Sequence, residues 1–438
     1  MPANEKNDRL STSPRIWIIE VGEPLPLPGT RIRVMRAGQL AKQLARDGAE
    51  VTWWVSDFNH LAKDYYDLAG FTGEGRLKSL ENGINLYFLH GRRYKKNISI
   101  SRILYNRDIA KDFQLSSVTL QPPDLIMCCY PTIDLANIVT KYGSKLGIPV
   151  VVDIRDLWPD VFVDVLPFPR WLSRLMMRPL MYKASRALRR AKTISGISEL
   201  ILEWGLAKAG RSRSEGDRVF PLSYERTELS ADRRINAEQK WRALGLKLDG
   251  NEPIVCCFAM LSHTPEFETI LEALLLLPET LAQTIRVVIC GTGPRLAWLK
   301  EASRVYPQLL VPGYVEVDAI ESLMPYAFAG LLPYPTRNDL SYSYPNKIGE
   351  YLSAGLPVIS TLGGSSANLL SSRNCGIVVK NRDAKNFASA LTQLANRDAE
   401  WQIMSTNALN TYSDMFNAKS NYTKMSEYLI KMINNRFA

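Results

Sequence analysis

Short apolar runs rich in β-branched residues alternate with helix-like stretches along almost the whole chain. Because parallel strands need a long crossover between them, usually a helix, this alternation predicts parallel α/β sheets. The first series of expected strands comprises Ile16–Glu20, Val51–Val55, Ile84–Leu89, Leu125–Cys129, Val150–Asp153 and Thr193–Gly196, with helices such as Met35–Asp47 and Ile133–Leu146 between them. The second series comprises Ile254–Phe258, Arg286–Cys290, Leu309–Val311, Ala329–Leu332, Val358–Ser360 and Gly376–Val379.

A polar, charged link at Ser223–Asn236 separates the two series. Each series spans about 200 residues, which is within the size range of one domain. The simplest architecture is therefore two Rossmann-like domains in tandem, residues 1–225 and 226–415. Asn421–Phe437 shows an amphipathic pattern, which predicts a terminal helix within residues 416–438.

The net charge of +10 is concentrated in the first half of the chain. Residues 1–225 hold 33 Lys and Arg against 24 Asp and Glu, whereas the remaining residues hold 21 against 20. A basic half beside a neutral half indicates an anionic partner for the first half. Nucleic acid, an anionic membrane surface and a phosphorylated acceptor are the candidate partners.

The cysteines and histidines argue against a disulfide framework and a metal centre. None of the six cysteines forms a CxxC pair, and most lie in apolar runs, so we expect buried thiols in a reducing cytoplasm. Only three histidines occur, and we expect no metal and no cofactor. Residues 1–14 are polar, unlike a signal peptide, and no apolar run approaches the length of about eighteen residues that a membrane span needs.

The stretch Tyr344–Ile359 combines a turn, a cation, a helix start, a carboxylate and a Gly-x-Pro stop before a strand. A helix N-terminus exposes N–H groups and positive dipole, so it favours an anion. Lys347 adds a cation, and Glu350 lies on the same helix face. A phosphate at the helix end and hydroxyls beside Glu350 would suit a nucleotide-sugar. The alternative is an ordinary amphipathic helix that ends at Gly355.

This stretch, Pro-Asn-Lys-Ile-x-Glu-Tyr-Leu-x-Ala-Gly-x-Pro-Val-Ile, resembles the donor-site helix of glycosyltransferase family 4. The resemblance implies the α/β GT-B fold, in which two Rossmann-like domains face each other across a cleft and a C-terminal helix crosses back to the first domain. It also implies transfer with retention of configuration. By the resemblance, Glu350 binds the ribose hydroxyls, while Lys347, Ser343 and the backbone near Asn346 hold the diphosphate. Family members often carry a second glutamate eight positions earlier, where this chain has Tyr342.

A second motif is Asp153-Ile154-Arg155-Asp156-Leu157-Trp158-Pro159-Asp160, directly after an expected strand. Acids and an arginine at the end of a strand are costly unless they lie in a cleft or are paired. The motif resembles a family 4 subgroup that builds O-antigens and exopolysaccharides, in which it lines the acceptor side. Asp153 and Asp156 could position or deprotonate an acceptor hydroxyl, with Arg155 beside them. The other interpretation is an internal Asp–Arg pair with a helix cap at Asp156, and the two interpretations are compatible.

Three glycine-bearing or aromatic segments complete the expected donor site. The loop Gly22–Arg31 follows the first strand, and Gly29 and Arg31 would face the crevice at the carboxyl ends of the strands. Gly291 and Gly293 follow a strand and would let the backbone approach a ligand closely. By the resemblance, the segment after the next strand holds the base, and Tyr314 there would stack on it.

The run from Arg170 to Lys192 holds eight basic and no acidic residues, interleaved with aromatic and aliphatic ones. Such a helix suits an anionic membrane surface, and its alternative is a solvated basic face. We expect Arg186, Arg189 and Arg190 on the membrane side. His60 is a possible acceptor contact, although a structural histidine is the better interpretation.

Together these features and the resemblance predict a hexosyltransferase of the family 4 type, for which the resemblance implies retention. It would move a sugar from a nucleotide-sugar, expected to be UDP-linked, to a polyprenyl-diphosphate-linked or growing glycan in cell-surface polysaccharide biosynthesis. It would lie in the cytoplasm, peripheral to the inner face of the membrane. A nucleotide-sugar 2-epimerase, an inactive nucleotide-sugar-binding protein and a nucleic-acid binder are the alternatives. The last is disfavoured because no nucleic-acid reader module is recognisable.

Overall fold

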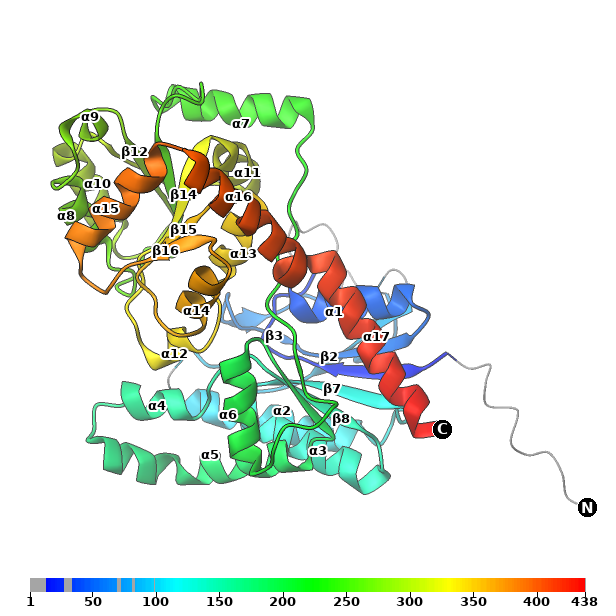
Figure 1. Cartoon of the computed structure of the whole chain (residues 1–438). Coiled ribbons are helices and arrows are strands. Elements are labelled where there is room, and N and C mark those ends of the chain that lie inside the picture. The colour runs from blue at the N-terminus through cyan, green and yellow to red at the C-terminus, as the bar shows by residue number, and fades with distance from the viewer. Residues whose placement is uncertain (1–12, 27–33, 69–71, 81–82, 98, 438) are drawn as a thin grey trace, which may run out of the picture. The chain divides into compact units, whose positions relative to one another are not determined.

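The computed structural model describes residues 13–26, 34–68, 72–80, 83–97 and 99–437. The chain forms two compact units (Figure 1). Unit 1 consists of Met1–Phe220 and Tyr422–Ala438, and unit 2 consists of Pro221–Asn421. The division between the units thus lies at 220/221, a few residues before the expected 225/226.

Unit 1 contains a sheet with the strand order β10-β9-β8-β7-β1-β2-β6-β5. Its pairs are parallel except that of β5 with β6. The strands are β1 (Arg15–Ile19), β2 (Glu50–Ser56), β5 (Leu77–Ser79), β6 (Ile84–Leu89), β7 (Leu125–Tyr130), β8 (Val150–Ile154), β9 (Thr193–Gly196) and β10 (Arg218–Val219). The six expected strands are confirmed. The small hairpin of β3 (Phe58–Asn59) and β4 (Asp64–Tyr65) was not predicted.

The helices of unit 1 are α1 (Arg36–Arg46), α2 (Ile100–Ser116), α3 (Ile133–Leu146), α4 (Asp160–Val165), α5 (Arg170–Arg190), α6 (Glu199–Ala209) and the last turns of α17 (Ala418–Phe437). Helix α3 packs against both α2 and α5, and α5 packs against α6. From Tyr422 onward α17 belongs to unit 1, where the Tyr428 hydroxyl lies 2.7 Å from the Thr193 hydroxyl.

Unit 2 repeats the same topology, with the strand order β13-β12-β11-β14-β15-β16 and parallel pairing throughout. The strands are β11 (Ile254–Phe258), β12 (Arg286–Cys290), β13 (Leu309–Gly313), β14 (Ala327–Leu332), β15 (Val358–Ser360) and β16 (Gly376–Val378). In both sheets the order reverses beside the first strand, as in doubly wound Rossmann-like folds. The carboxyl ends of the strands at such a reversal form the usual ligand-binding edge.

Helices cover both faces of the sheet of unit 2 (Figure 1). They are α7 (Ala231–Ala243), α8 (Phe267–Leu274), α9 (Glu279–Ala282), α10 (Leu296–Val305), α11 (Val317–Leu323), α12 (Asn338–Ser341), α13 (Asn346–Ser353), α14 (Ser365–Ser372), α15 (Ala384–Ala395) and α16 (Ala399–Thr411). Alternate residues of β11 enter two separate cores: Val255 and Cys257 pack with α8, α10 and α15, whereas Cys256 and Phe258 pack with α7, α13 and α14. A strand buried on both faces explains the continuous apolar run.

All six cysteines are free and buried, which confirms the prediction of buried thiols. Among the helices that the structure describes, none is long and apolar enough to cross a membrane.

Candidate functional site

Helix α13 presents a cation and a carboxylate at the ligand-binding edge of unit 2. It begins after Pro345, and no side chain caps its first turn. Lys347 forms an ion pair with the buried Glu350, one turn further along the helix. The Lys347 ammonium lies 5.7 Å from the ring centroid of Phe258, the last residue of β11. The pair therefore lies at the carboxyl end of the strand where the sheet order reverses.

Two glycines of the neighbouring loop are required by close packing of backbone on backbone. Gly291 and Gly293 both have φ of +149°. A Cβ on Gly291 would lie 1.8 Å from the carbonyl oxygen of Ala259, and a Cβ on Gly293 would lie 2.4 Å from that of Leu261. The loop after β12 is thus pressed against the loop after β11. The contact that excludes side chains here is therefore made by the protein's own backbone, and not by a ligand as the glycine pattern predicted.

The segment before α13 is held by the first turn of α14. The Ser365 hydroxyl donates to the carbonyl of Tyr342 at 3.0 Å, and the Ser366 hydroxyl donates to that of Ser343 at 3.4 Å. Asn346, the first residue of the helix, is exposed. Along this segment Asn346 is exposed and Ser343 and Lys347 are partly exposed, whereas Glu350 is buried and paired with Lys347.

Two exposed side chains follow the strands beside this segment. Tyr314, directly after β13, is 72% exposed, and Met260, shortly after β11, is 75% exposed. Large apolar side chains at the ligand-binding edge are suited to contact a nucleoside. Met260 was not singled out from the sequence, because a lone methionine in a loop carries no pattern.

Asp153, at the end of β8 in unit 1, is the centre of a buried ion-pair network. It is fully buried, and its carboxylate accepts from Nε of Arg36 at 2.9 Å and from Nη2 of Arg36 at 3.0 Å. The Ser195 hydroxyl donates to it at 2.8 Å, and Nε of Arg155 donates at 3.2 Å. Burial alone would raise the pKa of Asp153, but the charges of Arg36 and Arg155 and these hydrogen bonds outweigh it and hold the pKa at about 2.

The expectation that Asp153 positions or deprotonates an acceptor hydroxyl is therefore wrong. A carboxylate without exposed surface and with its oxygens occupied cannot touch a substrate. The internal Asp–Arg pair that the sequence left open is what the structure contains, although its main partner is Arg36 at the start of α1. Arg155 is also engaged, because its guanidinium pairs with Glu20, Glu23 and Asp153. Its side chain is 15% exposed, and a contact of Arg155 with the acceptor stays a prediction.

Asp156 and His60 lie nearer the surface of unit 1. Asp156 accepts from the backbone N–H of Leu157 at 2.8 Å. Burial lowers the pKa of Arg102, and the charge of Asp156 partly opposes that shift. Nδ1 of His60 and the Tyr94 hydroxyl form a hydrogen bond. Burial, together with the charges of Arg102 and Lys63, lowers the pKa of His60 to about 4, so the imidazole is neutral near pH 7. Gly29 and Arg31 lie outside the described residues.

Helix α5 carries the basic run, and only part of it is available. Arg186 and Arg189 are exposed, whereas Arg190 is partly buried and donates to the Asn137 side chain at 3.1 Å. The large apolar side chains exposed on the same helix are Trp171, Leu175, Met176 and Tyr182. The predicted mixed basic and apolar surface is present, but Arg190 is not a free part of it.

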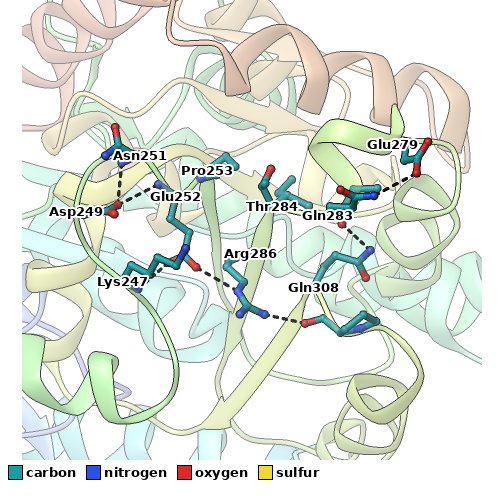
Figure 2. Close-up of a pocket in the computed structure, with 13 residues that line it drawn as sticks. Lys247, Asp249, Asn251, Glu252, Pro253, Glu279, Gln283, Thr284, Arg286 and Gln308 are labelled. Atoms are coloured by element: carbon teal, nitrogen blue, oxygen red, sulfur yellow. Dashed lines mark hydrogen bonds and ion pairs between the residues drawn. The ribbon is translucent and has the colours of Figure 1, made fainter.

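Unit 2 also has a cavity of about 570 Å³, lined by other residues than those described above (Figure 2). It is lined by residues that precede or begin β11, β12 and β13, so it lies at the amino ends of the strands. Nε of Arg286 pairs with Glu252 at 3.3 Å, and its Nη1 donates to the Pro307 carbonyl at 2.9 Å. None of the predicted site residues lines this cavity, and it is not part of the candidate donor site.

Within the described part of the chain, no three His, Cys, Asp or Glu side chains gather as ligands for a metal ion. Metal independence of the reaction stays a prediction.

Comparison with known proteins supports the interpretation of unit 2 and of the fold. Residues 252–397 match the family model described as glycosyl transferases group 1. No curated protein matches the chain in sequence.

Several solved structures share the fold over nearly the whole chain. Sucrose-phosphate synthase from Thermosynechococcus elongatus has a TM-score of 0.67 at 15% identity and covers 96% of this chain and 100% of its own. Anabaena HepE in complex with UDP has a TM-score of 0.61 at 13% identity, and the match covers 95% of this chain and 100% of that protein's chain. WaaG, a glycosyltransferase involved in lipopolysaccharide biosynthesis, has a TM-score of 0.61 at 16% identity, covering 94% and 99%. The two Rossmann-like sheets and these neighbours establish the GT-B fold, and with the family match they support a glycosyltransferase of the GT-B type.

Proposed function

We propose that this chain transfers a hexosyl group from a UDP-sugar to a lipid-linked or growing glycan in cell-surface polysaccharide assembly, with retention of configuration. The observation that carries the donor assignment is the Lys347–Glu350 pair on the first turns of α13. It lies at the ligand-binding edge of unit 2, within the residues that match the glycosyltransferase family model. Structural neighbours that hold UDP or UDP-glucose support a nucleotide-sugar as the donor.

The ion pair suggests how the donor is received. In the absence of ligand, Glu350 neutralises Lys347, and both groups are partly shielded from water. A diphosphate at the first turn of α13 would take over Lys347, and the released Glu350 carboxylate would accept hydrogen bonds from the ribose hydroxyls. Ser343 and Asn346 would contact the phosphates, Gly291 and Gly293 would shape the adjoining loop, and Tyr314 would stack on the base.

The same groups would stabilise the leaving group during transfer. In a retaining front-face reaction the C1–O bond to the diphosphate breaks, and the acceptor oxygen bonds to C1 on the same face. The acceptor proton passes to the departing phosphate oxygen. Negative charge therefore grows on the diphosphate, where the α13 dipole and Lys347 act without a metal ion. Asp156, at the surface of unit 1, would orient the acceptor hydroxyl.

Unit 1 would meet the membrane through α5. Arg186 and Arg189, together with the exposed Trp171 and Tyr182, form a basic surface with large apolar side chains. Such a surface binds anionic lipid headgroups while its rings enter the interface. The chain would thus be peripheral at the cytoplasmic face.

The test is a thermal-shift panel of UDP, GDP, TDP, UMP and ADP on the full chain. A ligand at a hundred times its Kd stabilises the folded state by about 2.7 kcal/mol. We expect UDP to raise the Tm most, Lys347→Ala to weaken UDP binding more than uridine binding, and Glu350→Ala to weaken both. Lys300→Ala, an exposed lysine on α10, is the matched control.

A wild-type protein that binds none of these nucleotides would refute the donor assignment. If UDP binds, transfer is tested next with UDP-sugars and membrane extracts, and the released UDP is measured. Interconversion of the sugar without an acceptor would point instead to the 2-epimerase alternative.

A further inference from the structure

Two cations of unit 1 converge on one tyrosine ring from separate segments of the chain. The Lys63 ammonium lies 4.7 Å from the ring centroid of Tyr94, and the Arg102 guanidinium carbon lies 5.7 Å from it. Lys63 donates to the Asn97 side chain at 2.5 Å, and Arg102 donates to the Asn97 carbonyl at 2.9 Å. Lys63 follows β3, Tyr94 and Asn97 follow β6, and Arg102 lies in the first turn of α2. We call these four residues the cation cluster.

The backbone holds Lys63 in place at a cost. The Asn59 side chain accepts from the backbone N–H groups of Leu61 and Ala62 at 2.9 and 3.0 Å, and Lys63 N–H donates to the Asn59 carbonyl at 2.8 Å. In this tight turn Lys63 has φ of +60°, a left-handed conformation that is unfavourable for a non-glycine residue. A strained backbone that presents a charged side chain is often part of a binding site.

Tyr94 is a rigid base for the cluster. It is buried, and its ring packs between those of Phe58, at 4.9 Å, and Tyr105, at 5.1 Å. The Tyr94 hydroxyl is bonded to His60. The guanidinium of Arg102 also lies 4.7 Å from the ring of Trp158, which belongs to the segment after β8. The cluster and Trp158 thus bring together the segments after β3, β6 and β8, of which β6 and β8 belong to the large sheet of unit 1.

The charge at the cluster is not balanced within it. Among the described residues, neither Lys63 nor Arg102 forms a salt bridge with a carboxylate, and Asp156 is the acid whose charge acts on Arg102. Burial lowers the pKa of Arg102 and of Lys63, and the charge of Arg102 lowers that of Lys63 further. Holding two cations this close is unfavourable unless an anion joins them. On α5, by contrast, Lys183 is paired with Asp134.

We propose that the cation cluster binds the diphosphate that links lipid and glycan in the acceptor. The planar guanidinium of Arg102 can hold phosphate oxygens in a bidentate manner, and the Lys63 ammonium adds a second positive charge beside it. The Trp158 ring beside Arg102 offers an apolar surface for the first carbons of the lipid. This inference rests on the proposed function for the lipid-linked nature of the acceptor. It assigns a site in unit 1 that is separate from the donor contacts of α13.

The experiment measures binding of geranyl diphosphate and of inorganic pyrophosphate to the full chain by calorimetry. Saturating UDP is present, so that the donor site is occupied. The variants are Lys63→Gln, Arg102→Gln and, as a matched control, Arg107→Gln, an exposed arginine on the same helix. We expect each of the first two to raise the Kd for geranyl diphosphate about tenfold or more, and Arg107→Gln to leave it unchanged. The Tm of each variant shows whether it is folded. If Arg102→Gln does not fold, the affinity of Lys63→Gln alone decides whether the proposal holds.

Wild-type affinity in both Lys63→Gln and Arg102→Gln, or an equal loss in Arg107→Gln, would overturn the proposal. If geranyl diphosphate binds more tightly than pyrophosphate, the natural ligand is lipid-linked; equal affinities would indicate a free diphosphate at the same site. UDP binding is measured separately on each variant and should not change. A wild type that binds geranyl diphosphate but no UDP would therefore refute the donor assignment and leave the cation cluster standing.

Discussion

Replacing Asp153 by asparagine should destabilise unit 1 strongly. Asparagine has nearly the same volume, so no cavity forms, but the negative charge that faces Arg36 and Arg155 is lost. The Arg36 side chain is only 4% exposed and cannot turn to water for compensation. Leaving a buried charge without its partner typically costs about 3–5 kcal/mol. For a unit of this size that corresponds to a fall in Tm of roughly 6–20 °C.

The matched control is Asp164→Asn, since Asp164 pairs with Arg170 on the surface of the same unit. The side chains of that pair are 66% exposed for Arg170 and 43% for Asp164. An exposed pair contributes about 0–1 kcal/mol, so we expect little change in Tm. Calorimetry resolves the transitions of the two units, and far-UV circular dichroism shows that both variants are folded. Equal Tm values for the two variants would refute the reasoning.

The pH dependence gives a second check on the same network. Folding lowers the pKa of Asp153 from 3.8 to about 2, so its contribution is fully present above the unfolded value and is lost as the pH falls toward 2. The shift in pKa contributes about 2 kcal/mol to the free energy of unfolding. This is less than the loss expected for the substitution, because protonation removes only the part of the stability that depends on the pKa shift. The difference in Tm between the wild type and Asp153→Asn should shrink between pH 4.5 and pH 2. A constant difference would contradict the assigned pKa.

Three further predictions concern other parts of the chain. Gly291→Ala should destabilise unit 2 by about 1–3 kcal/mol, because the new Cβ would overpack against the backbone. Gly313 has φ of +88° and no atom within 4 Å of a new Cβ, so Gly313→Ala should cost only about 1 kcal/mol. Equal losses of stability in the two variants would argue against the backbone contact. Neutralising Arg186 and Arg189 together should weaken binding to anionic vesicles about tenfold at low salt, and unchanged binding would leave α5 with a solvated basic face. The imidazole of His60 should titrate near pH 4 when followed by NMR. Because folding lowers its pKa, its contribution to stability is present above pH 6.5 and is lost as the pH falls toward 4. A titration midpoint near 6.5 would instead place the ring in water.

The strands, the two-unit plan and the segment around α13 could be predicted from the sequence, because these features depend on local patterns. Apolar runs, helical periodicity and the Gly-x-Pro stop act over a few residues. The pair of Lys347 and Glu350 needed only helical spacing to be placed on one face. The basic and apolar surface of α5 could be predicted for the same reason, because its exposed residues all lie on one helix.

The role of Asp153 was decided only by the tertiary structure. Its motif resembles an acceptor site, but its partner Arg36 lies 117 residues earlier in the chain, and no local pattern joins them. The cation cluster was hidden in the same way, because Lys63, Tyr94 and Arg102 come from three segments. Periodicity records which residues share one element, whereas the pairing of charges depends on which elements the sheet places side by side. The sequence alone therefore determined the elements and their order, and the packing of distant segments decided which charged groups are buried partners and which remain available to bind an anion.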